Sequence, residues 1–227
     1  FSYYNNQLRH FVGAVKEFEV TPDPSNEKLT KRVEGIDHDG STVTTSVTVE
    51  RPLTLFLNSR EIVTMMTISD YPEYLAVGYL VNQNMLHSDD EVVDIDYDDD
   101  LEVVVVRTKY ETDFEDKLQK KTLTSGCAQG TIFGDLMESF EGIKFNGSIR
   151  LRTSELYDLL KKINTAPSLY LEAGAIHGCV LCLGNQPLIY MEDVGRHNAV
   201  DKIAGYMFVN NIKANDIVVV ASKGVSN

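Results

Sequence analysis

The sequence is poor in cysteine and has no long run of apolar residues. Its 227 residues include three cysteines, Cys127, Cys179 and Cys182. This odd number is too small for a disulfide framework and indicates reduced thiols in a reducing compartment. No apolar run reaches the length of a membrane-spanning helix, and the N-terminus lacks the basic region and apolar core of a signal peptide. These absences predict a cytoplasmic protein without a membrane anchor.

Basic residues are also scarce. Lysine and arginine number 21 against 34 acidic residues, which gives a net charge of −13. A surface that binds nucleic acid needs many clustered basic side chains, so the composition argues against a nucleic-acid partner. Nine of the fourteen residues from 89 to 102 are Asp or Glu. We interpret them as solvated strand faces and a turn, because the central glycine of an EF-hand calcium loop is absent.

The N-terminal half combines short strand signals with one helix. Strands are predicted over residues 43–49, 53–57, 61–67, 92–97 and 102–107. Asp70 is the expected N-cap of the helix, with Pro72 in the first turn and Glu73 completing a capping box. These elements predict an α+β domain over residues 1–115.

The C-terminal half alternates strands and helices. Helical apolar spacing follows Cys127 and recurs over 155–163 and 200–208, and strand signals occupy 174–183, 188–191 and 217–221. The alternation predicts a layered α/β domain over residues 116–227, with helices on both faces of its sheet. The last strand has no successor and the first residue is Phe1, so we expect the protein to extend beyond both ends of this sequence.

Cys127 lies in a glycine-flanked loop directly ahead of a predicted helix. Ser125 and Gly126 precede it and Gly130 follows. The unpaired N–H groups and the dipole of a helix N-terminus favour a thiolate, which can attack or carry sulfur. A small buried cysteine beside a core helix is an equally simple interpretation of this stretch alone.

Residues 192–202 join a strand to the next helix, and ligands bind at such junctions in α/β sheets. Asp193, Arg196, His197 and Asn198 crowd into six positions there, and Lys202 follows one turn later. Arg196 offers a planar fork for phosphate or carboxylate, and His197 can move protons near neutral pH. The simpler alternative is a helix cap at Asp193 or Asn198 with Arg196 as its ion-pair partner. A cap needs one polar residue, so we favour ligand binding.

A third motif, His177 with Cys179 and Cys182, has the composition of a zinc site. Residues three apart in a strand point to opposite faces, so these two cysteines cannot share one metal in a regular strand. We therefore interpret both as core side chains. His177 stays either a structural histidine at a strand end or a residue of the site.

Three motifs stand in a fixed order: Thr-Ser-Gly-Cys at 124–127, Gly-Ala-Ile-His at 174–177 and Glu-Asp-Val-Gly-Arg-His-Asn-Ala-Val-Asp-Lys at 192–202. Together they resemble the formate dehydrogenase accessory sulfurtransferase family of the FdhD/NarQ type. The first half agrees, with Glu-Arg-Pro-Leu at 50–53 and Leu-Ala-Val-Gly-Tyr-Leu at 75–80. The resemblance covers residues 47–224.

The resemblance implies a cytoplasmic homodimer that takes sulfur from a cysteine desulfurase as a persulfide on Cys127. It also implies transfer of that sulfur to the molybdenum or tungsten atom of bis-molybdopterin guanine dinucleotide, the cofactor of formate dehydrogenase. The second domain is implied to be cytidine-deaminase-like and truncated at its C-terminus. The residues expected to bind the cofactor are Ser125, Gly126, His177, Asp193, Arg196, His197, Asn198 and Lys202.

The sequence departs from the family pattern at three points. Gly130 stands where many members have the second cysteine of a Cys-x-x-Cys motif, which implies a single-thiol relay. The zinc-binding motif of the deaminases is missing, so no zinc is expected. The guanine-nucleotide-binding segment of the family lies beyond Asn227. Two alternatives stay open: a cofactor chaperone without sulfur chemistry and, less favoured, a zinc hydrolase of the deaminase type.

Overall fold

The computed structural model describes residues 19–110, 112, 151–184, 186–213 and 221–223. The loop that carries Ser125, Gly126, Cys127 and Gly130 lies outside these residues, as do the helix predicted after it and most of the predicted strand over 217–221. The described elements are β1 (Thr30–Ile36), β2 (Thr42–Thr48), β3 (Arg51–Leu57), β4 (Arg60–Thr67), α1 (Pro72–Asn82), β5 (Val92–Asp98), β6 (Val103–Thr108), α4 (Thr153–Thr165), α5 (Leu169–Ala173), β7 (His177–Leu183), β8 (Gln186–Asp193), α6 (Arg196–Val209) and β9 (Ala221–Lys223).

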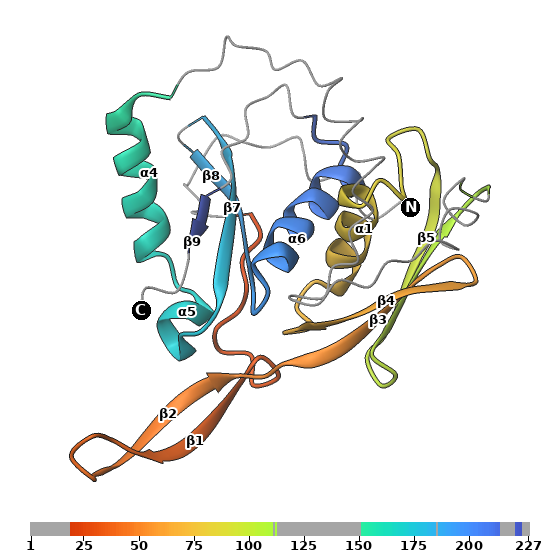
Figure 1. Ribbon diagram of the computed structural model, residues 1–227. Coiled ribbons are helices and arrows are strands. Elements are labelled where there is room, and N and C mark those ends of the chain that lie inside the picture. Colours follow the sequence, from red (N-terminus) through yellow and green to blue (C-terminus); the bar gives the residue numbers. More distant parts are fainter. Residues whose placement is uncertain (1–18, 111, 113–150, 185, 214–220, 224–227) are drawn as a thin grey trace.

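The body of the molecule is layered (Figure 1). A four-stranded sheet of order β4-β3-β6-β5 packs against α1, and a three-stranded sheet of order β8-β7-β9 packs against α6. The helices α1 and α6 lie side by side between the two sheets, and α4 covers the other face of the second sheet. The prediction of helices on both faces of the second sheet is thereby confirmed.

The first sheet follows from alternating burial. The three leucines of β3, Leu53, Leu55 and Leu57, are fully buried in one cluster with Leu75 and Leu80 of α1. Because successive strand residues point to opposite faces, this spacing turns one face of β3 toward the helix. The strands predicted over 43–107 and the helix of the first half are confirmed with small shifts at their ends, whereas β1 was not predicted. The predicted boundary at residues 115 and 116 falls outside the described residues and stays a prediction.

The start of α1 differs from the prediction. Tyr71, not Asp70, occupies the N-cap position, with left-handed backbone angles of φ 51° and ψ 54°, and no side chain caps the helix. A capping side chain requires extended backbone at the cap residue. The left-handed residue rules that out, and Asp70 is left one position too early to serve as the cap.

The three named strands of the second sheet pair antiparallel. β7 begins at His177 rather than at residue 174, because a short helix that was not predicted, α5, ends at Ala173 with Gly174 as its C-cap at φ 64°. Cys179 packs in a cluster with Ala199 and Ile203 of α6, whereas Cys182 packs with Leu159 and Ile163 of α4. The two cysteines therefore lie on opposite faces, as predicted. The cytidine-deaminase-like layering of this half stays a prediction.

The two halves meet where α1 crosses α6. A Cβ atom on Gly78 would lie 1.6 Å from the backbone oxygen of Asp201, and one on Gly205 would lie 1.9 Å from that of Tyr74. Real Cβ atoms never approach this closely. The helix backbones are in direct contact there, and only glycine fits at either position.

A ribbon made of β1 and β2, residues 30–48, projects from the body (Figure 1). No residue of the ribbon belongs to any of the hydrophobic clusters of the described chain. Its tip carries Ile36, which is 78% exposed. Among the described helices none combines the length and hydrophobicity that crossing a membrane requires.

Candidate functional site

The candidate site surrounds the turn between β8 and α6. β8 ends at Asp193, and α6 starts at Arg196 with Gly195 as its N-cap and without a side-chain capping bond. The simpler alternative, in which Asp193 or Asn198 caps the helix, is therefore wrong. The Asp193 carboxylate instead accepts a bond from the N–H of Gly195 at 3.2 Å and turns toward the interior.

A buried ion pair lies beneath this turn. The Lys202 ammonium lies 2.7 Å from Oδ2 of Asp193, and both side chains are 0% exposed. Lys202 also donates to the backbone oxygen of Glu192 at 2.9 Å, and Thr67 donates to the same Asp193 oxygen at 2.5 Å. A buried charge needs a partner and hydrogen bonds to offset its lost hydration, and here each charge has both. The pair ties α6 to β8, and Thr67 ties both to β4.

Asn198 extends this connection to the first sheet. Its side-chain amide donates to Oδ1 of Asp193 at 3.0 Å and to the backbone oxygen of Met66 at 2.8 Å. A neutral amide can make both bonds because its nitrogen has two hydrogens. Asn198 is 9% exposed. It therefore fixes the turn relative to β4 and does not extend into solvent.

Glu192 holds a neighbouring element. Its buried carboxylate accepts bonds from the backbone N–H groups of Leu169 at 2.7 Å and Tyr170 at 3.2 Å, and from the hydroxyl of Tyr190 at 2.8 Å. The two amides belong to the first turn of α5, where N–H groups lack helical partners. Glu192 thereby positions α5 and the segment that leads into His177.

Two of the predicted site residues face solvent. Arg196 and His197 are exposed at the start of α6, whereas Asp193, Asn198 and Lys202 are buried beneath them. The exposed pair is available to an anionic ligand and to proton transfer. The buried three hold the turn that presents it. Their contacts with a cofactor stay a prediction.

His177 lies beside the turn on the adjacent strand. It is the cross-strand partner of Asp193 in the antiparallel pair of β7 and β8, and it is half-buried. Its Nδ1 atom is buried and has no hydrogen-bond partner among the residues that the structure describes. A polar atom in this state is suited to a ligand or a water, which agrees with the site interpretation of His177.

Asp70 is a residue of this region that the sequence analysis assigned to the wrong role. Its Oδ2 atom is buried without a partner in the described part of the chain. Burial raises the pKa of the Asp70 carboxyl to about 6; Lys202 opposes this shift, and the carboxylates of Asp193 and Glu192 add to it. Thr67 was not predicted to belong to the site, and Glu192 was named only as the first residue of the motif at 192–202. Only the capping pattern pointed to Asp70, and nothing in the sequence signalled Thr67.

The zinc interpretation of His177, Cys179 and Cys182 finds no support in the geometry. The cysteines lie on opposite faces of β7, and burial raises the pKa of the Cys179 thiol to about 12 and that of Cys182 to about 11. Metal-bound cysteine is a thiolate, so both environments oppose metal binding. Over the described ranges, His/Cys/Asp/Glu side chains gather closely enough for a metal only in the local, mostly exposed group at the ribbon tip, Asp37, His38 and Asp39.

Comparisons with known proteins agree with the motifs. The sequence model of the FdhD/NarQ family matches residues 48–227. The chain is 26% identical over 188 residues to "Sulfur carrier protein FdhD" of Listeria monocytogenes serotype 4b, and 26% identical over 188 residues to the protein of the same name from Bacillus subtilis. Each alignment covers 82% of this chain and 72% of the relative.

A solved structure has the same fold. It is a crystal structure from Desulfotalea psychrophila, assigned as a candidate formate dehydrogenase accessory protein. The TM-score is 0.61 at 20% sequence identity, and the similarity covers 86% of this chain and 72% of that chain. At this identity the similarity concerns the fold alone.

Proposed function

This chain belongs to the FdhD/NarQ family, and on that premise we propose that it is a sulfur carrier for the maturation of formate dehydrogenase. Cys127 accepts sulfur from a cysteine desulfurase as a persulfide. It then delivers that sulfur to the molybdenum or tungsten atom of bis-molybdopterin guanine dinucleotide, which binds as the substrate. The observation that carries the proposal is the match of the family model over residues 48–227, which include Cys127.

The environment of the other cysteines supports the choice of Cys127. Cys179 is 0% and Cys182 is 1% exposed, and burial raises the pKa of both thiols. A thiol must be accessible and deprotonated to attack a persulfide. Neither condition holds for these two, so Cys127 is the remaining cysteine of the chain for the transfer.

The first step is a thiol exchange without net oxidation. The Cys127 thiolate attacks the outer sulfur of the desulfurase persulfide, and a new S–S bond forms as the old one breaks. The desulfurase cysteine leaves as a thiolate. The predicted position of Cys127 ahead of a helix favours the attacking thiolate, because a helix N-terminus stabilises negative charge.

The turn between β8 and α6 would bind the cofactor. Arg196, exposed at the start of α6, offers a bidentate fork to a phosphate or pterin edge, and His197 beside it would move a proton. His177 would contribute its Nδ1, which has no partner within the described part of the chain, and Ser125 and Gly126 would flank the sulfur. Asp193, Asn198 and Lys202 would act as positioning residues beneath the exposed pair.

The test is intact-mass analysis after incubation with a cysteine desulfurase and cysteine. The wild-type chain should gain one sulfur that a reductant removes, and Cys127→Ala should gain none. Cys182→Ala is the matched control, because it removes a buried thiol and should leave the gain unchanged. Persulfide formation on Cys127→Ala would contradict the assignment. Activation of formate dehydrogenase in cells by Cys127→Ala would instead indicate a cofactor chaperone without sulfur chemistry.

A further inference from the structure

The outer edge of β2 in the ribbon has no neighbour among the described strands, and its sequence differs from that of ordinary free edges. β2 pairs with β1 on one side, and no other described strand pairs with it. Proteins usually protect such edges with charged residues, proline or bulges, because a free edge is a template for another strand. β2 reads Thr-Val-Thr-Thr-Ser-Val-Thr and contains none of these. The charged residues of the ribbon strands, Lys31, Arg32 and Glu34, all lie on β1.

The backbone pattern shows which groups β2 offers. The N–H of Val49 donates to the oxygen of Leu29, and the N–H of Asp37 donates to the oxygen of Ser41. In an antiparallel ladder, bonded pairs alternate with non-bonded pairs along each strand. The odd-numbered residues of β2 therefore bond to β1. The even-numbered residues, from Thr42 to Thr48, direct their N–H and C=O groups outward.

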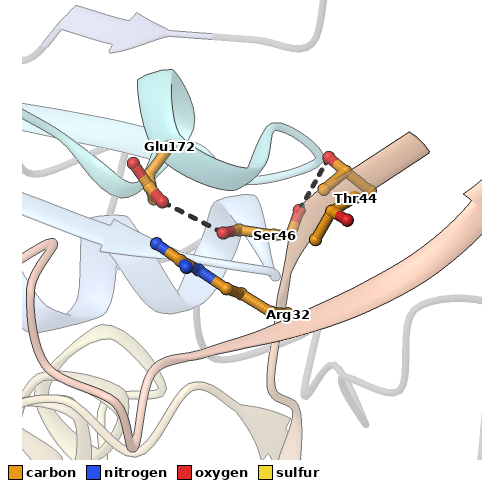
Figure 2. A pocket seen from close by; sticks show the side chains of 5 residues that line it. Arg32, Thr44, Ser46 and Glu172 are labelled. Carbon is orange, nitrogen blue, oxygen red and sulfur yellow. Dashed lines mark hydrogen bonds between the residues drawn. The ribbon is translucent and has the colours of Figure 1, made fainter.

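The two faces of the ribbon differ. Arg32, Thr44 and Ser46 share the face nearest α5, and Ser46 donates to the Glu172 carboxylate at 3.0 Å (Figure 2). The opposite face carries Val33, Val43 and Val47, and the last two are each 38% exposed. A two-stranded ribbon with an uncovered valine face is marginally stable in water by itself.

The sequence of β2 is close to a palindrome about Thr45. Read from either end, threonine comes first and valine second, and Thr44 corresponds to Ser46. An antiparallel strand pair related by a two-fold axis through Thr45 would place Val43 opposite Val47 of the partner subunit. In this register Thr44 lies opposite the other copy's residue 46. Both positions are even-numbered, so their backbone N–H and C=O groups point away from β1 and toward the other copy's β2. The strand is therefore self-complementary in its side chains and in its hydrogen bonds.

We propose that β2 pairs with β2 of a second copy of this chain, about a two-fold axis through Thr45, to form a four-stranded sheet. The pairing adds about eight backbone hydrogen bonds if all seven residues pair. It gathers the three valines of the ribbon and their counterparts on one face, and no charged side chain stands opposite a like charge. Except for residue 48, the ribbon precedes the stretch that matches the family model. The resemblance implies a homodimer but no particular interface, and the proposal assigns that interface to β2.

A cysteine at the axis tests the proposal directly. In the paired state the Cβ atoms at position 45 of the two copies lie about 5 Å apart, since this is a non-bonded antiparallel pair. Thr45→Cys should therefore form a disulfide between subunits under mild oxidation, and mass spectrometry should identify it as two copies of one peptide joined through position 45. Thr42→Cys is the matched control. Its two copies would lie about 20 Å apart along the paired strands and should not cross-link.

A proline on the outer edge tests the same interface without a cross-link. Thr44→Pro removes an outward N–H and leaves the ladder between β1 and β2 intact, because the residues that bond to β1 are the odd ones. The mass measured by analytical ultracentrifugation at micromolar concentration should fall from dimer to monomer, with an unchanged circular dichroism spectrum. A monomeric wild type, an equally dimeric Thr44→Pro, or Thr45→Cys that cross-links no better than Thr42→Cys would each overturn the proposal. The persulfide test measures the sulfur gained by Cys127 and does not depend on the oligomeric state. The two proposals can therefore fail independently.

Discussion

The helix junction and the ribbon are built in opposite ways. At the junction, α1 and α6 are in contact at Gly78 and Gly205, and α6 also carries the buried residues Asp201 and Lys202. The ribbon contributes nothing to the described hydrophobic clusters, and its strands are largely exposed. The junction is constrained from within the chain. The β2 sequence of the ribbon is explained best by a contact outside it.

The family match also separates the ribbon from the helix junction. Residues 48–227 match the family model, and these include both junction helices and the turn at Asp193 but only the last residue of the ribbon. The buried pair of Asp193 and Lys202 binds the end of β8 to α6, and Thr67 and Asn198 bind both to β4. The exposed residues Arg196 and His197 are therefore held by contacts from both halves.

The largest effect is expected from adding a side-chain atom where the backbones of α1 and α6 are in contact. In Gly78→Ala the new Cβ would meet the backbone oxygen of Asp201 at 1.6 Å, so the helices must separate. Backbone cannot rotate away as a side chain can, and we expect a loss of at least about 4 kcal/mol in the free energy of unfolding, or failure to fold. Urea denaturation followed by circular dichroism measures this loss.

Gly35 in the ribbon provides the control. A Cβ there would meet its nearest neighbour, Cγ2 of Val43, at 4.0 Å, which is ordinary contact. Gly35→Ala should change the free energy of unfolding by less than about 0.5 kcal/mol. If Gly78→Ala proved as mild as Gly35→Ala, the close approach of the two helices would be wrong.

A smaller loss is expected from breaking the buried ion pair. Lys202→Met leaves the Asp193 carboxylate buried without a cation, which costs about 3 to 5 kcal/mol in comparable pairs. Combining it with Asp193→Asn removes the unpaired charge and should recover part of the loss, because Asn still accepts one bond and has no net charge. Chemical denaturation of the two single variants and the double variant gives the coupling.

An exposed pair beside the ribbon is the comparison for Lys202. Lys28 and Asp99 lie 2.8 Å apart with side chains 65% and 49% exposed. Exposed pairs keep most of their hydration whether paired or not, so Lys28→Met should leave the denaturation midpoint unchanged within error. Equal effects of Lys28→Met and Lys202→Met would contradict the burial of the second pair.

The fold could be predicted where burial follows a local period. The alternating leucines of β3 and the spacing of Leu159 and Ile163 in α4 depend on neighbours within a few residues, and these elements are confirmed. The helix α1 is confirmed too, although it is buried without interruption from Leu75 to Leu80. The helix α5 was missed because it has only five residues, of which one, Leu169, is fully buried. Its ordering depends on the Glu192 carboxylate, which is distant in sequence.

The sequence predicted the candidate site only as a cluster of polar residues, without their individual burial. Spacing indicated that Asp193, Arg196, His197 and Asn198 are close together, but it could not tell which of them are buried. That division depends on Thr67 and on the Met66 oxygen, which are 126 and 132 residues away from their partners. Contacts at such separations leave no periodic trace in one sequence.

The smallest of these effects is a change with pH at the junction. Burial raises the pKa of the Asp201 carboxyl to about 6; the bond from Asn82 at 2.6 Å opposes the shift, and Asp193 adds to it. The ordinary value is 3.8, so the folded state holds this proton more tightly than the unfolded state. The resulting stability is present below about pH 4 and is lost as the pH rises through about 6.

Asp201→Asn imitates the protonated carboxyl and keeps an acceptor for Asn82. The variant should exceed the wild type by about 1 to 3 kcal/mol in the free energy of unfolding at pH 7, and the difference should vanish below about pH 4. The pKa of Asp70 is also raised to about 6, so Asp70 affects the stability of the wild type and of the variant alike. The quantity to measure is therefore the difference between the stability curves of the variant and the wild type. Glu34→Gln, which removes an exposed carboxyl of the ribbon, is the control for the loss of one acidic group. A difference for Asp201→Asn that is constant from pH 4 to pH 7 would show that this carboxyl is not buried at the junction, because only a shifted pKa makes the gain depend on pH.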